Sequence, residues 1–381
     1  MRDSGTRLWL FAALCAASIA LAAAYTWKAT AAAPAFAPKS LPPAVTARPV
    51  PESGGEPSFP EPSFPAAPEP RRQHTTHAAT TTYQPPATLL VRHTALDQSY
   101  GALAIESLDG ESTRTATALH CERVHFAAGR GVCLDAERGV VTTYTAVLFD
   151  SAFHVSGRIP LAGPPSRTRV SPDGRLAATT VFLFGHSYAA AKFSTETRIF
   201  DAVTGAPVVD NLEQMEVWSQ GSRLQPADAN FWGVTFARAS DEFYATLGTG
   251  GHTYLVRGDI RAHRVEVVAD GIECPSLSPD NTRIAFKKRD TGPGLAHWRL
   301  YVLDLATLAE SPVAESRFID EQVEWLDAAH ILYTQPDASG RSAAISDVWM
   351  VAADGSGEPT LLLREAETPT VMHAGKNALT P

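Results

Sequence analysis

The chain has 381 residues, of which 19% are charged, and it carries a formal net charge of −9 at pH 7. This balance argues against a nucleic-acid partner, because binding to phosphates requires Lys and Arg concentrated on one face. The first quarter of the chain is too rich in Ala, Pro and Ser to build a core, so one large folded unit is expected after it.

Residues 8–27 form an almost entirely apolar segment, preceded by Arg2 and Arg7 and followed by Lys28. A run of about 20 apolar residues suits a membrane span better than the shorter core of a signal peptide. We therefore expect residues 1–28 to form a cytoplasmic tip and a single-pass anchor, with everything after them on the extracytoplasmic side. The Ala-rich positions 22–24 and 31–33 also suit cleavage, so a secreted form without the anchor is the alternative.

Residues 29–86 contain about half of the prolines of the chain and two tandem Glu-Pro-Ser-Phe-Pro units. Pro-rich sequence of this kind favours extended polyproline conformations and no packed core. This segment is expected to be a disordered spacer between the membrane and the folded domain.

Four cysteines occur, and no two have the Cys-x-x-Cys spacing of a zinc site. Cys121 and Cys133 flank a short candidate hairpin, so outside the cytosol they either form a disulfide or remain thiols. The sequence does not decide between these alternatives, because it does not give the Cα separation that a bridge requires. Cys274 is expected to be a buried free thiol.

Residues 87–381 are predicted to be all-β, because short β-branched and aromatic runs alternate with Gly, Pro, Asp and Asn about every ten residues. Two tight hairpins are clearest, Ser-Pro-Asp-Gly after Val170 and Ser-Pro-Asp-Asn after Leu277. Second hairpins are expected at residues 102–110, 145–157, 197–205, 253–261, 299–307 and 347–355.

Alternating the two hairpin types gives about six four-stranded units, which is the repeat of a β-propeller. The first unit lacks an early hairpin, so residues 89–92 are expected to pair with the C-terminal region 361–372 and close the ring. The prediction is a six-bladed, monomeric β-propeller.

The hairpins resemble those of TolB-like propellers, in which a Ser-Pro-Asp-Gly turn is followed by an Ile-Ala-Phe-type strand and a Tyr-Val-x-Asp-type strand. The likeness covers residues 87–372 and is best at 171–177, 278–286 and 301–304, with a weaker copy at 348–355. Residues 230–236, 273–279 and 322–327 are similar to a group of exported bacterial TolB-like proteins of unassigned activity. The resemblance implies a propeller that interacts with proteins in the cell envelope.

Residues 183–189 are similar to the nucleophile elbow of α/β-hydrolases, with Ser187 in the place of the nucleophile. An elbow requires a strand before it and a helix after it, but residues 192–200 alternate as a strand. We therefore interpret the motif as a long hairpin connection and assign no catalytic residue. No motif for a metal or a cofactor is found.

Aligning the innermost strands of the blades places glutamates at equivalent positions before three of them, at Glu122, Glu273 and Glu321. Asp228, Asn230 and Trp232 fall beside this position in another blade. A ring of negative charge at the mouth of the channel would attract a cation or a basic peptide end. The alternative is that the glutamates pair with Arg123, Arg167 or Arg169. The basic run 287–289 is interpreted as a solvated turn or edge.

These observations predict a membrane-tethered propeller, not an enzyme, that binds an envelope protein or peptide at its channel mouth. The alternative function is a propeller-type hydrolase or lyase acting on peptide or glycan.

Overall fold

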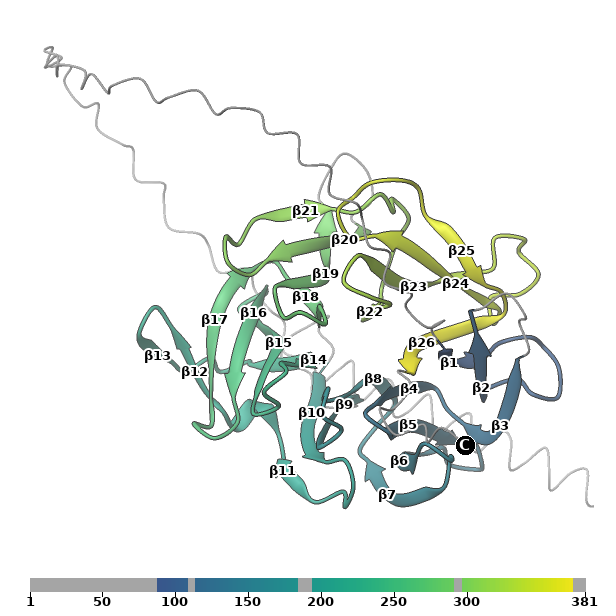
Figure 1. Cartoon of the computed structure of the whole chain (residues 1–381). Helices are drawn as coiled ribbons and strands as arrows, with labels where there is room; N and C mark the ends of the chain where they lie inside the picture. Colours follow the sequence, from purple (N-terminus) through teal and green to yellow (C-terminus); the bar gives the residue numbers. More distant parts are fainter. Residues whose placement is uncertain (1–87, 109–113, 184–193, 291–296, 373–381) are drawn as a thin grey trace, which may run out of the picture. The chain divides into compact units, whose positions relative to one another are not determined.

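The computed structural model describes residues 88–108, 114–183, 194–290 and 297–372. These residues form six β-sheets arranged as blades around a central channel (Figure 1). The all-β, six-bladed propeller predicted from the sequence is therefore confirmed.

Within each blade the strands follow one another from the channel outward. Blades 1 to 3 contain β26 (Ala366–Met372), β1 (Thr88–His93), β2 (Ala102–Ser107) and β3 (Thr115–His120); β4 (Arg123–Ala127), β5 (Arg130–Glu137), β6 (Thr143–Asp150) and β7 (Val155–Leu161); and β8 (Pro165–Val170), β9 (Leu176–Leu183), β10 (Ser194–Asp201) and β11 (Pro207–Val209).

Blades 4 to 6 contain β14 (Asn230–Phe236), β15 (Glu242–Thr249), β16 (His252–Asp259), β17 (Arg264–Asp270), β12 (Glu216–Ser219) and β13 (Ser222–Leu224); β18 (Glu273–Leu277), β19 (Arg283–Asp290), β20 (His297–Asp304) and β21 (Glu310–Pro312); and β22 (Glu324–Trp325), β23 (His330–Pro336), β24 (Ser346–Ala352) and β25 (Thr360–Leu363).

The ring closes by pairing strands from the two ends of the described chain. β26 is the innermost strand of blade 1 and pairs antiparallel with β1, with Leu89 opposite Val371. This pairing, which the sequence predicted, joins the last strand to the first and removes the exposed edges that an open ring would leave.

The Ser-Pro-Asp-Gly hairpin forms because side chains satisfy the turn. The Ser171 hydroxyl donates to Asp173 at 2.6 Å and accepts from the backbone N–H of Leu176 at 2.9 Å. Gly174 takes a positive φ of 71°, which costs a residue without Cβ little. Ser278 makes the same pair of hydrogen bonds in blade 5, to Asp280 and from Arg283.

Blade 4 differs from the repeat, because it contains six strands. The chain between blades 3 and 4 forms a short 3-10 helix, η1 (Leu212–Gln214), and then the β12–β13 hairpin. β12 pairs parallel with β17, so the hairpin extends the blade outward (Figure 1). This hairpin accounts for the one long gap between repeats in the sequence.

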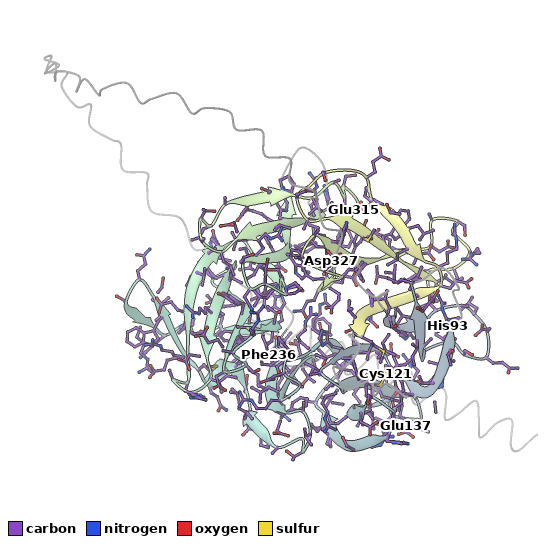
Figure 2. The ribbon with its side chains drawn as sticks, viewed as in Figure 1. His93, Cys121, Glu137, Phe236, Glu315 and Asp327 are labelled. Carbon is purple, nitrogen blue, oxygen red and sulfur yellow. A yellow bond between two sulfur atoms is a disulfide. The ribbon has the colours of Figure 1, made fainter. Side chains whose placement is uncertain are left out.

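The core consists of apolar side chains packed between neighbouring blades (Figure 2). The cluster between blades 1 and 2 contains both Cys121 and Cys133. These residues form a disulfide with a Cα–Cα distance of 5.4 Å, across twelve residues of sequence. The bridge connects the segment that enters β4 with β5, and Cys274 is a buried free cysteine.

The predicted anchor at residues 8–27, the spacer at residues 29–86 and Ser187 lie outside the described residues. Among the residues that the structure does describe, no helix is long and apolar enough to cross a bilayer.

Candidate functional site

The innermost strands β4, β8, β14, β18, β22 and β26 surround the channel and all start at the same end of it. Their mutual hydrogen bonds establish this direction, because residues at similar heights meet: Phe126 of β4 with Thr370 of β26, and Leu277 of β18 with Thr235 of β14. We call the end where these strands start the upper mouth. The loops between the second and third strands of each blade lie on the same face, because the four strands nearest the channel in every blade pair antiparallel in succession.

The three aligned glutamates lie at this upper mouth, as the sequence alignment of the blades predicted. Glu122 directly precedes β4, Glu273 begins β18, and Glu321 lies three residues before β22. The repeat therefore places these residues correctly in the fold.

The prediction that they form an unpaired negative ring is wrong. Glu122 pairs with Arg138 at 2.8 Å, and Glu273 lies 3.6 Å from Lys287 and accepts a hydrogen bond from Trp298 Nε1 at 3.1 Å. Glu321 accepts from the backbone N–H of Thr334. The partners come from the loop or strand beside each glutamate, so the upper mouth contains both signs of charge.

Asp228, Asn230 and Trp232 belong to the start of β14 and brace it against its neighbours. Asp228 accepts from Thr249 Oγ1 at 2.5 Å, and Asn230 Oδ1 accepts from the N–H and hydroxyl of Thr195 at 2.9 and 2.7 Å. Trp232 is buried. Asn230 thus joins blade 4 to blade 3, and Asp228 holds the start of β14 against the end of β15 in the same blade.

The basic run 287–289 is not a solvated turn, because it lies within β19. Lys287 is buried at the upper mouth, pairs with Asp320 and lies over the ring of Trp298 at 4.8 Å. Arg289 covers the same ring at 4.7 Å. Side chains two residues apart in a strand point to the same face, so Lys287 and Arg289 both lie beside the indole of Trp298. The indole and the neighbouring carboxylates compensate their charge.

A segment that connects blades 5 and 6 crosses the upper mouth, and we call residues 313–323 the strap. Its first half is held by Glu315, a buried carboxylate that accepts hydrogen bonds from Arg317 and Tyr333. Further along, the N–H of Ile319 donates to Trp298 O at 3.0 Å. The strap carries Asp320, Glu321 and Gln322 to the channel, and no motif in the sequence indicated it.

Gln322 closes part of the channel by bridging two other blades. Its Nε2 donates to the carbonyls of Val234 at 2.9 Å and Pro275 at 2.8 Å. Both carbonyls lie at bulges in β14 and β18, where the strand register shifts. Gly233 has a φ of 67°, and a Cβ there would come 2.9 Å from the Cα of Cys274, so this close approach requires glycine.

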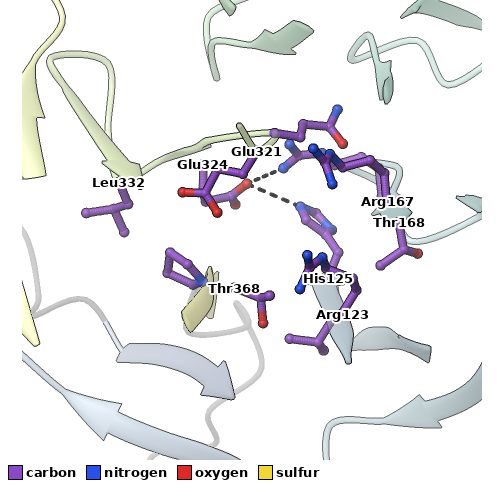
Figure 3. Close-up of a pocket in the computed structure, with 12 residues that line it drawn as sticks. Arg123, His125, Arg167, Thr168, Glu321, Glu324, Leu332 and Thr368 are labelled. Atoms are coloured by element: carbon purple, nitrogen blue, oxygen red, sulfur yellow. Dashed lines mark hydrogen bonds and ion pairs between the residues drawn. The ribbon is translucent and has the colours of Figure 1, made fainter. Parts of the chain in front are cut away.

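Below the strap, a charged cluster spans the channel (Figure 3). Arg169 of blade 3 pairs with Glu324 of blade 6, and its other amino group donates to Val323 O at 3.0 Å. His125 accepts from the N–H of Val170 through Nδ1, so its proton is on Nε2, which faces Glu324 at 3.5 Å. From the sequence, Arg169 was expected only as a partner for the glutamates, and no motif pointed to His125 or Glu324.

The ionisation of this cluster follows from burial and pairing. Burial opposes the charge of Glu324, but Arg169 and His125 outweigh it and lower the pKa of Glu324 to about 2. Burial lowers the pKa of His125, so the ring is neutral at pH 7. Glu321 shifts in the opposite direction. Its burial away from bulk water raises its pKa to about 7, because this effect outweighs the attraction of Arg123 and Arg167 for the charged carboxylate.

Ser187 lies outside the described residues, which stop at the end of β9 and resume at the start of β10, so its interpretation as part of a hairpin connection stays a prediction. The described residues contain no group of three or more His, Cys, Asp or Glu side chains arranged to hold a metal ion.

No family model matches the sequence, and no curated protein matches it. Solved structures do match the fold: TolB from Acinetobacter baumannii aligns with 18% identity and a TM-score of 0.50, covering 75% of this chain and 66% of TolB. The chain has the TolB-like six-bladed propeller fold. It spans about two thirds of that TolB chain.

Two other matches to this TolB-like propeller have lower TM-scores. A chain of a nidogen–laminin complex aligns with 11% identity and a TM-score of 0.49, covering 75% of this chain and 98% of the other. An oligogalacturonate lyase in complex with manganese aligns with 11% identity and a TM-score of 0.39, covering 71% and 75%. At such low identity, similarity concerns the fold and not the activity.

Proposed function

We propose that this TolB-like propeller is an exported, membrane-tethered scaffold or sensor that binds a protein or peptide of the cell envelope on its upper face. The observation that carries this proposal is where the exposed apolar side chains lie. The four most exposed large apolar residues in the described part of the chain are Leu96, Val140, Val141 and Phe318. All four lie on the upper face, in the β1–β2 loop, the β5–β6 loop and the strap. Apolar side chains gathered on one face favour a protein contact.

A surface groove on the same face supports a peptide partner with charged groups. The groove has a volume of about 590 Å³ and is lined by Tyr100, Arg92, Glu122, Arg138 and Glu367, together with the β23–β24 loop. Arg92 stacks on the ring of Tyr100 at 4.9 Å and pairs with Glu367 at 2.8 Å. Glu122, one of the residues proposed from the sequence, thus borders the groove beside the exposed Arg138. Paired charges at a rim favour specificity and steering more than affinity.

The Cys121–Cys133 disulfide supports export, because such bridges persist in oxidising compartments outside the cytosol. The apolar residues 8–27 then supply the anchor and residues 29–86 the spacer, with a secreted form as the alternative. The same topology places the folded domain in the envelope, where such partners occur.

Binding is favoured over catalysis because the titratable groups of the channel are engaged with each other. Glu324 and Arg169 pair across the channel, and His125 bonds to the backbone of the next blade. Side chains held in this way serve to join blades.

The test is site-specific photo-crosslinking of the full chain in its native host. A photoreactive amino acid at Val141, on the upper face, is expected to capture a discrete partner. The matched control is Leu308, a similarly apolar exposed residue in the turn between β20 and β21 on the opposite face. Equal capture at Leu308, or none at Val141, Leu96 and Phe318, contradicts the proposal.

A further inference from the structure

A small cavity lies inside the channel between the strap and the Arg169–Glu324 pair. Its volume is about 40 Å³, which exceeds the space that one water molecule requires. Blades 1, 2, 3 and 6 contribute its walls, with Arg123 and His125 on one side and Glu321 and Leu332 on the other (Figure 3). It is distinct from the surface groove, because no residue lines both.

Three polar atoms of the residues that line this cavity are buried and have no hydrogen-bond partner within the described part of the chain. They are Nε of Arg167, Nε of Arg169 and Oγ1 of Thr368. The side chain of Arg169 is only 9% exposed. Buried donors are almost always satisfied in folded proteins, so three such atoms on residues that line one cavity indicate a species that accepts hydrogen bonds.

The charges around the cavity identify the sign of that species. Three guanidinium groups, from Arg123, Arg167 and Arg169, line it, against the two carboxylates of Glu321 and Glu324. Glu324 forms an ion pair with Arg169. Burial and the neighbouring Arg167 lower the pKa of Arg123, as expected where cations are crowded together. Among the lining residues the excess charge is therefore positive, while Asp320 lies behind the wall 3.7 Å from Arg167 and Glu367 lies 4.0 Å from Arg123.

The geometry points to a binding site for one small monovalent anion, of the halide class, held by Arg167, Arg169 and Thr368 inside the propeller channel. A halide accepts several hydrogen bonds at once and compensates the excess positive charge. The three ligands come from blades 3 and 1, and Arg169 connects them to blade 6, so the bound anion stabilises the ring across its centre. This site goes beyond docking at the upper face and does not depend on it.

Anion binding is expected to weaken as the pH rises from 6 to 8. The reason is Glu321, whose pKa is about 7 and whose ionisation adds a negative charge beside the anion. Burial lowers the pKa of His125, which disfavours a charged ring there, and the strands β23 and β26 contribute no titratable side chain to the wall. The other charged or titratable groups nearby are Asp320, Lys287, Glu367 and the thiol of Cys274, which lies near Arg167.

The experiment is thermal unfolding of the purified full chain, with bromide or chloride replacing gluconate at constant ionic strength. The unfolding temperature is expected to rise with halide concentration and to level off, with a larger response at pH 6 than at pH 8. Glu321→Gln is expected to give the pH 6 response at both pH values. Crystals soaked in bromide are expected to show one anomalous peak in the cavity.

Two matched variants separate the site from a general salt effect. Thr368→Val removes a hydroxyl that lines the cavity and is expected to raise the half-maximal halide concentration roughly tenfold. Thr180→Val removes a buried hydroxyl that bonds to Thr197, touches neither the cavity nor Glu321, and is therefore expected to leave the response unchanged. The inference is overturned if halide and gluconate act alike, if both variants respond as the parent does, or if bromide is absent from the cavity.

Discussion

Replacing Glu324 by Gln tests whether the cross-channel ion pair stabilises the propeller. The substitution keeps the size and hydrogen bonding of the side chain but leaves the buried guanidinium of Arg169 without its counter-charge. A carboxyl pKa of about 2, against 4.5 for an unperturbed glutamate, corresponds to about 3 kcal/mol of stability at neutral pH. Removing one partner of a buried pair typically costs a similar amount.

The pH dependence gives the sharper test of this reasoning. Because folding lowers the pKa of Glu324, its stabilising effect is complete above pH 4.5 and is lost as the pH falls toward 2. The difference in unfolding free energy between the parent and Glu324→Gln, measured by urea denaturation, is expected to be about 3 kcal/mol at pH 7 and clearly smaller at pH 3.

The control is Glu358→Gln, which removes an exposed carboxylate and is expected to change stability by less than about 0.5 kcal/mol. A loss below about 1 kcal/mol at pH 7, or a difference that does not shrink at pH 3, refutes the role given to the pair.

Three further predictions concern packing, the disulfide and the membrane. Gly131→Ala places a Cβ about 2.0 Å from the ring of Phe149 and is expected to lower the free energy of unfolding by about 1–3 kcal/mol. In the control Gly139→Ala, the new Cβ meets only a backbone oxygen at 3.6 Å, so no change in stability is expected. Equal urea midpoints for the two variants would contradict this prediction. Replacing both Cys121 and Cys133 by Ala is expected to lower the free energy of unfolding by about 3 kcal/mol relative to the oxidised parent. Relative to the reduced parent no difference is expected, and thermal unfolding with and without reductant measures both comparisons. A reporter active only outside the cytosol, fused to the C-terminus, is expected to work, and the protein is expected to stay with membranes after a high-salt wash; release into the medium would indicate cleavage.

The blade repeat could be predicted from the sequence because its signals are local. Ser171, Asp173 and Gly174 satisfy a tight turn within a few residues of chain, so the turn type can be recognised without knowledge of tertiary contacts. Closure of the ring by β1 and β26 was predictable for a related reason, since a unit with a missing hairpin must complete its sheet elsewhere. The β12–β13 hairpin was not predicted, because its strands are only four and three residues long and carry little hydrophobic periodicity.

The charges at the upper mouth show why the site was harder to predict than the fold. The repeat determines that Glu122, Glu273 and Glu321 lie at the same end of the channel, because equivalent positions in each blade have equivalent places in the ring. The partner of each glutamate follows no repeat: Arg138 comes from a loop of the same blade, and Lys287 from the neighbouring strand.

The strap contributes the remaining groups, and it belongs to one connection only. Asp320 reaches Lys287 and Arg167 because residues 313–323 happen to be long enough to cross the channel, and Gln322 then bonds to backbone carbonyls that carry no side-chain signal. Contacts of this kind join residues that are far apart in sequence through backbone atoms and a single insertion. An alignment of blades therefore predicts where charged side chains gather in such a propeller, whereas the sign and strength of the resulting field depend on the connections between blades.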